Sequence, residues 1–138
     1  PYSEDHIPKL LAHVTSKKNS LKPFLLLLPE WVHKKDYYMA ALKHSKVQPF
    51  YMIPKKRYVY VPPPKFRDKR KSDVHKKSSP FVSMWYIWGG STDMTYELME
   101  GYRATYGTHG PCDVARSKNA LRDLRRKEKR HPTTITNL

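Results

Sequence analysis

The sequence predicts a small α+β domain, mainly helical, with long irregular basic extensions. Three observations favour this class. Apolar residues recur at helical spacing in three or four segments, two short runs have the composition of strands, and a proline- and lysine-rich stretch lacks the apolar residues of a core. Hydrophobic residues make up 38% of the 138 residues, which allows a single domain with a modest core. We expect this domain to be ordered by the assembly around it.

The N-terminal region, residues 1–54, should be largely helical. Its first helix spans residues 7–14, where Ile7 and Leu11 lie one turn apart and Pro8 suits a first helical turn. This pattern is typical of a short amphipathic helix that docks on its own domain.

The most hydrophobic run of the chain, FLLLL at residues 24–28, follows that helix and is bounded by prolines on both sides. It predicts a short buried segment. Five residues are too few to cross a bilayer, which takes about 20.

A second helix should begin at Pro29 and Glu30 and continue to about Lys46, because proline and an acid suit the first turn and lysines suit the last. One of its faces would carry Trp31, Tyr38 and Leu42. The basic side chains that lie largely elsewhere are His33, Lys34, Lys35 and Lys43. A solvated face and an RNA-binding face explain these bases equally well.

Strand signals are short and few. Residues 47–53, VQPFYMI, are apolar but contain Pro49, which predicts an edge strand or an extended linker. Residues 58–61, YVYV, and residues 81–88, FVSMWYIW, have high strand propensity. We therefore expect at most a small sheet, formed from these last two runs.

The stretch at residues 55–77, KKRYVYVPPPKFRDKRKSDVHKK, holds ten Lys and Arg against two acids. Buried unpaired charge is too costly for such a segment to enter a core. Its three consecutive prolines cannot continue a helix and lack the donors of a central strand. We expect an extended segment that binds the phosphates of RNA.

The aromatic region, residues 78–112, is the one part of the chain that is not basic, with a single Arg against three acids. A glycine pair forms a turn after the strand. Thr92 or Asp93 is the candidate N-cap of a helix that should run to about Tyr106, with Gly107 ending it. One stripe of this helix repeats every fourth residue and consists of Met94, Leu98, Tyr102 and Tyr106. We expect this region to pack on protein.

The C-terminal region, residues 113–138, should form a basic helix and an irregular tail. Asp113 is a candidate N-cap, and the helix should reach Arg130. Leu121 and Leu124 give only a thin apolar line, so most of the circumference is polar. So many bases with so few acids favour contact with the RNA backbone.

The net charge of +15 describes the partners of the chain and not its fold. It is compatible with nucleic acid, an anionic membrane surface or an acidic protein. The single cysteine excludes an intrachain disulfide framework and a zinc site built on several cysteines. His109 and Cys112 have the spacing of two metal ligands, but no second pair completes a site. We predict no catalytic residue, no metal and no cofactor.

The predicted RNA-binding residues all lie in the two basic segments. In the first segment they are Lys55, Lys56, Arg57, Lys65, Arg67, Lys69, Arg70, Lys71, Lys76 and Lys77. In the C-terminal helix they are Arg116, Lys118, Arg122, Arg125, Arg126, Lys127, Lys129 and Arg130. The candidates for base stacking are Tyr58, Tyr60 and Phe66, and the two tyrosines suit packing on protein as well.

Three hypotheses about function fit these observations to different degrees. The first is a structural protein of a large ribonucleoprotein, such as a ribosome, which binds ribosomal RNA and neighbouring ribosomal proteins. The second is a peripheral accessory subunit of a mitochondrial respiratory or ATP synthase complex. The third, an enzyme or a sequence-specific reader of nucleic acid, is the weakest, because no motif of a finger, homeodomain, RRM or KH domain is present.

The irregular, basic, Pro- and Tyr-rich composition is typical of proteins specific to organelle ribosomes. The sequence therefore favours a mitochondrial ribosome in the matrix. A cytosolic or nuclear ribonucleoprotein is the alternative.

Overall fold

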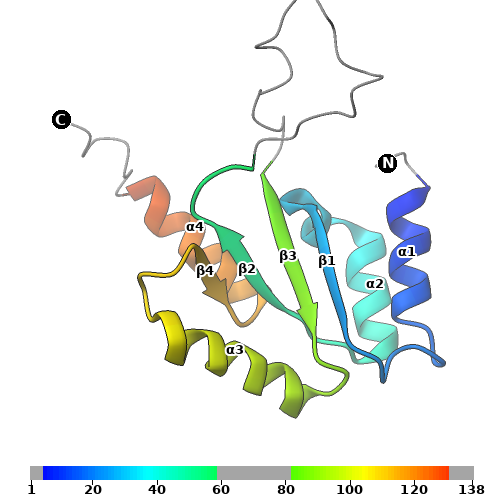
Figure 1. The fold of residues 1–138 in the computed structure, drawn as a ribbon. Helices are drawn as coiled ribbons and strands as arrows, with labels where there is room; N and C mark the ends of the chain where they lie inside the picture. The colour runs from blue at the N-terminus through cyan, green and yellow to red at the C-terminus, as the bar shows by residue number, and fades with distance from the viewer. Residues whose placement is uncertain (1–4, 59–81, 131–138) are drawn as a thin grey trace, which may run out of the picture.

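The computed structural model describes residues 5–58 and 82–130, and of residues 128–130 it describes the backbone alone. Within these ranges the chain forms four α-helices, a 3₁₀ helix and a four-stranded antiparallel sheet (Figure 1). In chain order the elements are α1 (His6–Val14), β1 (Phe24–Pro29), η1 (Glu30–Lys34), α2 (Asp36–Ser45), β2 (Phe50–Pro54), β3 (Ser83–Trp88), α3 (Thr92–Tyr106), β4 (Cys112–Ala115) and α4 (Lys118–Arg130). The predicted α+β class is confirmed, with a larger sheet than expected.

The strands are ordered β1-β3-β2-β4, so β3 and β2 lie inside the sheet. β3 pairs with all six residues of β1 and with Phe50–Met52 of β2. The expectation of an edge strand or linker at residues 47–53 was wrong. Pro49 lies just before β2 and Pro54 is its last residue, so neither missing amide interrupts the ladder between them.

The FLLLL run forms β1, an edge strand, and its burial is uneven. Leu28 is buried, whereas the side chain of Leu25 is 63% exposed. The prediction of a short buried segment therefore holds at one end of the strand only. Of the predicted strand at residues 58–61, Tyr58 lies outside any strand and the rest lies outside the described residues.

The helix predicted from Glu30 to Lys46 is divided into two elements. Lys35 adopts an extended conformation between η1 and α2, with φ −80° and ψ 147°. The 3₁₀ turn directs Val32 and His33 into the core, while Trp31 remains 38% exposed. The extended backbone of Lys35 ends η1, and α2 begins separately at Asp36.

The sheet separates two hydrophobic layers (Figure 1). On one face α1, α2 and α4 pack against the sheet, and this main core includes Leu11, Tyr38 and Leu121 from the helices. On the other face α3 contributes Met99 to a small cluster with Phe50 and Ile87. Three helices therefore share one face, and α3 lies by itself on the other.

Three tyrosines occupy the centre of the main core. The ring of Tyr86 meets those of Tyr38 and Tyr51 edge to face, with centroids 5.5 and 5.4 Å apart. The hydroxyls of Tyr38 and Tyr51 share a hydrogen bond at 2.6 Å, and the Tyr86 hydroxyl donates to the carbonyl oxygen of Pro29 at 2.9 Å. Burial raises the pKa of all three, that of Tyr51 to about 12. Each buried hydroxyl is thus satisfied inside the core.

α3 starts after the predicted glycine turn. Gly90 has a φ of +94°, which favours glycine, and Ser91 is the N-cap because its Oγ accepts from the Met94 amide at 3.0 Å. The cap therefore lies one or two residues before the predicted candidates, Thr92 and Asp93. Gly107, with φ +57°, ends the helix as predicted. Of the predicted stripe on this helix, Met94, Leu98 and Tyr106 stay exposed, and Thr95 and Met99 are the residues that are buried.

In the part of the chain that the structure describes, no helix combines the length and the apolar character that a membrane crossing requires.

Candidate nucleic-acid interface

The basic helix α4 is held on the domain by its thin apolar line. Leu121 is fully buried in the main core and Leu124 packs against it. Ser117 accepts a hydrogen bond from the Ala120 amide at 3.2 Å and so caps the helix. The predicted cap, Asp113, lies instead in β4, where it pairs with Ile53. The helix begins later than predicted because residues 112–115 extend the sheet.

A groove of about 490 Å³ lies between α4 and the η1–α2 segment. The residues that line it are Glu30, His33, Lys34, Met39, Lys118, Leu121, Arg122, Arg125 and Arg126. Five of these carry a positive charge and one, Glu30, is a carboxylate. The structure thus brings four of the predicted RNA-binding residues of α4 together with Lys34, which the sequence left open between solvent and RNA.

Glu30 and Arg125 form an ion pair inside this groove. Their side chains are only 18% and 27% exposed, so the pair is shielded from water more than a surface pair. Arg126 lies 4.0 Å from Asp123 at a well-exposed position, where the interaction is weak. The one carboxylate of the groove is therefore already engaged by a cation of the same groove.

His33 is a buried, uncharged part of the groove wall. Its Nδ1 is hydrogen-bonded to the backbone carbonyl oxygen of Glu30, and its ring lies near Tyr51. Burial lowers the pKa of His33, with the nearby Lys34 and Lys118 acting in the same direction. The imidazole is therefore neutral at pH 7, and the positive charge of the groove comes from Lys and Arg.

A second hollow of about 440 Å³ adjoins the first and shares Lys118 with it. It is lined by Leu42, Lys43, Val47, Gln48, Pro49, Tyr51, Arg116, Ser117, Lys118 and Asn119. Arg116 reaches across it, since its guanidinium donates to the Gln48 carbonyl oxygen at 3.4 Å. The described lining holds three cations and no carboxylate. The two hollows form a basic surface that we call the α4 groove, lined in total by seven Lys and Arg and one acid.

The first basic segment joins the fold close to the α4 groove. The amide of Glu30 donates to the carbonyl oxygen of Val82 at 2.8 Å, and residue 82 is where the described chain resumes. Because Glu30 also pairs with Arg125, the end of the segment that follows residues 55–77 meets the domain beside α4. The described chain therefore resumes, after the first basic segment, at the end of the sheet beside α4.

The first residues of that segment lie on another side of this end. Lys55, Lys56 and Arg57 are exposed, and the Lys55 ammonium donates to the Thr108 carbonyl oxygen in the loop after α3. The structure does not bring these three residues into the α4 groove. The predicted residues outside the described ranges are Tyr60, Lys65, Phe66, Arg67, Lys69, Arg70, Lys71, Lys76 and Lys77.

The remaining predicted residues have individual positions. Lys127 is exposed on α4, and Lys129 and Arg130 lie in its last turn, where only the backbone is described. Tyr58 is half-buried, and its hydroxyl accepts a hydrogen bond from the Trp85 indole at 3.0 Å. Tyr58 thus packs on protein in this structure.

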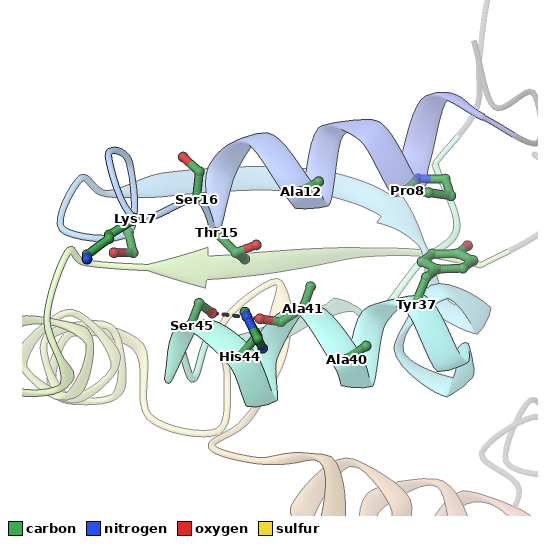
Figure 2. A pocket seen from close by; sticks show the side chains of 11 residues that line it. Pro8, Ala12, Thr15, Ser16, Lys17, Tyr37, Ala40, Ala41, His44 and Ser45 are labelled. Atoms are coloured by element: carbon green, nitrogen blue, oxygen red, sulfur yellow. Dashed lines mark hydrogen bonds between the residues drawn. The ribbon is translucent and has the colours of Figure 1, made fainter.

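A third hollow, of about 800 Å³, lies between α1 and α2 and differs in chemistry (Figure 2). Small side chains from both helices, Ala12, Ala40 and Ala41, line much of it, and Lys17 and His44 lie at one end. Its lining lacks the concentration of cations found beside α4. We therefore place the candidate nucleic-acid interface at the α4 groove.

The sequence predicts the cations of the α4 wall as RNA-binding residues and leaves Lys34 and Lys43 of the opposite wall open between solvent and RNA. Lys34 and Lys43 come from η1 and α2, and only the packing of α2 beside α4 reveals their place. Within the described residues, no three His, Cys, Asp or Glu side chains are grouped so that they could hold a metal ion. Comparisons with protein-family models, with curated proteins and with solved structures found no match.

Proposed function

We propose that this chain is a non-catalytic structural component of a large ribonucleoprotein, bound to RNA phosphates through the α4 groove and the basic segment at residues 55–77. The observation that carries the proposal is the concentration of seven Lys and Arg in two adjoining hollows, whose described lining holds a single acid that is already paired. Such a cluster repels itself unless an anion lies between its members. A polyanion that follows the groove relieves this repulsion at several positions at once.

Phosphate is the anion that suits these side chains best. Arg122 and Arg126 can each offer two parallel donors to one phosphate, whereas Lys34 and Lys118 act as point charges. Contacts of this kind position a protein on RNA but carry little sequence information. Binding should therefore be strong at low salt and largely independent of sequence.

Among ribonucleoproteins we propose a ribosome, and the mitochondrial ribosome before the cytosolic one, with the chain located in the matrix. This choice is supported by the Pro- and Tyr-rich basic composition. The aromatic region at residues 78–112 would contact neighbouring ribosomal proteins, since it is the one part of the chain without a basic excess.

The test is co-sedimentation of the full chain from lysed mitochondria and from cytosol. We expect the chain to sediment with a particle that contains mitochondrial ribosomal RNA, and to leave the sedimenting fraction after ribonuclease treatment. Sedimentation with membranes that ribonuclease does not change would favour the alternative, a peripheral subunit of a respiratory or ATP synthase complex.

A further inference from the structure

Helix α3 exposes more apolar surface than its position on the domain requires. Only Thr95 and Met99 are buried, whereas Met94 and Leu98 are each 44% exposed and Tyr96 is 53% exposed. Single exposed apolar residues are ordinary, but Met94 and Leu98 lie one turn apart on the same flank of α3, and neighbouring exposed apolar side chains mark interaction sites.

The exposed residues on one flank of α3 form a regular stripe. Met94, Leu98, Gly101 and Thr105 follow the spacing i, i+4, i+7 and i+11, and the first two each come one position before a buried residue, Thr95 and Met99. Two large apolar side chains are thus followed by two small residues along a single line. We call these four residues the α3 stripe.

Among the described residues, none packs against the position that a side chain at Gly101 would occupy. A Cβ atom added there would meet nothing within 4 Å, and the residue is exposed in the middle of a helix. Glycine weakens a helix relative to alanine at such a position. What glycine does offer is close approach for the backbone of a neighbour, and here the space beside it is open.

The charge around the stripe has the opposite sign to the rest of the protein. α3 carries Asp93, Glu97 and Glu100 but only one cation, Arg103, which pairs with Glu100 at 3.1 Å. Asp93 and Glu97 lie next to the stripe on the side away from the sheet, at the angles that helical spacing gives them. RNA would be repelled here, because its phosphates would face these carboxylates.

We propose that the α3 stripe docks an α-helix of another protein, one with an apolar face flanked by Lys or Arg. The apolar face would lie on Met94 and Leu98, the backbone would approach Gly101, and the basic flank would pair with Asp93 and Glu97. A second copy of this chain fits poorly, because two α3 helices would bring their carboxylates together. The proposal rests on the proposed function, since it identifies the surface by which the chain would meet a neighbour in its particle.

The test uses site-specific photo-crosslinking in the full chain, made in the cells that naturally produce it. One variant carries p-benzoylphenylalanine in place of Met94, and a matched variant carries it in place of Tyr96, on the opposite flank of α3. After irradiation, the crosslinked peptides are identified by mass spectrometry. We expect one protein neighbour from position 94, linked through a peptide of net positive charge, with a yield at least tenfold above that from position 96.

The substitution Gly101→Met, added to the position-94 variant, should reduce this yield at least tenfold, because the methionine occupies the space of the partner backbone. Circular dichroism should show the fold intact, since the added side chain meets nothing within the chain. The salt dependence of RNA binding should not change. RNA binding also separates the two proposals, because an unsubstituted chain that binds no RNA would refute the proposed function, whereas the crosslink yields would still test the docking.

Several outcomes would overturn the docking proposal. One is a crosslink from position 94 to RNA, to another copy of this chain or to an acidic peptide. Another is an equal yield from positions 94 and 96, or no crosslink at all in an intact particle. The last is a crosslink yield that Gly101→Met leaves unchanged.

Discussion

Arg125 on α4 and Glu30, the first residue of η1, form a partly buried ion pair although they lie 95 positions apart in the sequence. The carbonyl oxygen of Glu30 is hydrogen-bonded to Nδ1 of His33, and its amide donates a hydrogen bond to the carbonyl oxygen of Val82. One residue thus connects α4, η1 and the start of β3. The ion pair joins the two walls of the α4 groove close to Val82, where the described chain resumes after the basic segment.

Replacing Glu30 with Gln should affect stability and RNA affinity in opposite directions. The fold loses the partner of a partly buried guanidinium, which should cost about 1–3 kcal/mol of unfolding free energy. The groove loses its one carboxylate, so RNA should bind more tightly at low salt. Urea denaturation and fluorescence anisotropy with a labelled RNA measure the two effects. Asp123→Asn is the control, since its pair with Arg126 is exposed and should be worth less than about 0.5 kcal/mol.

Removing cations from the α4 groove should weaken the salt dependence of RNA binding. The triple variant Lys118→Gln, Arg122→Gln, Arg126→Gln removes three phosphate contacts. At about 0.7 released counterions per contact with single-stranded RNA, the slope of log affinity against log salt should flatten by about 2. The control, in which Lys9, Lys17 and Lys18 become Gln, makes the same change of net charge on exposed residues elsewhere. Equal losses in both triple variants would mean that total charge, and not the groove, controls binding.

The basic segment at residues 55–77 should contribute to RNA binding independently of the α4 groove. Changing Lys69, Arg70 and Lys71 together to Gln should also flatten the slope by about 2, with little change in sequence preference. Because these residues and the α4 residues meet different phosphates, the two triple variants should be nearly additive. An affinity and slope that this second triple variant leaves unaltered would show that these bases face solvent, lipid or acidic protein.

The tyrosine cluster should make the fold sensitive to high pH. Burial raises the pKa of Tyr38, Tyr51 and Tyr86 above the ordinary value of 10.0, so the folded chain keeps these protons where the unfolded chain loses them. The contribution of these tyrosines to the free energy of unfolding is complete below pH 10. It is lost as the pH rises toward and past about 12, the pKa of Tyr51. In this pH range, each such tyrosine should lower the free energy of unfolding by about 1.4 kcal/mol per pH unit. Urea midpoints at pH 8, 10 and 11 measure the decline, and equal midpoints would contradict it.

Thr95 should be a stability residue of α3. It is fully buried, its hydroxyl donates to the Ser91 carbonyl oxygen at 2.6 Å, and it accepts from the Gly89 amide at 2.8 Å. Thr95→Val leaves that amide without its acceptor and should cost about 1–3 kcal/mol. Thr105→Val is the matched control, because the Thr105 hydroxyl bonds only the Gly101 carbonyl oxygen at an exposed site. Thermal unfolding should separate the two variants, and similar melting temperatures would show that the Thr95 hydrogen bonds contribute little.

The sequence by itself determined the features that depend on local periodicity and on composition. Helix α1 lies close to its predicted bounds because its apolar residues recur at helical spacing, and α3 does so because a glycine turn precedes it and Gly107 ends it, which are local signals. The division of the chain into basic segments and one acidic, aromatic region also follows from the residues alone.

The tertiary structure decided what depends on pairing between distant segments. β1, β2 and β4 are short runs whose propensity is ambiguous, and they become strands because β3 and β2 offer them partners in register. The same pairing places α2 beside α4 and so brings Lys34 and Lys43 to the groove of Lys118. The periodicity of a single segment cannot predict that these residues lie close together. Their proximity arises from the free energy of burying one segment against another that is distant in the sequence.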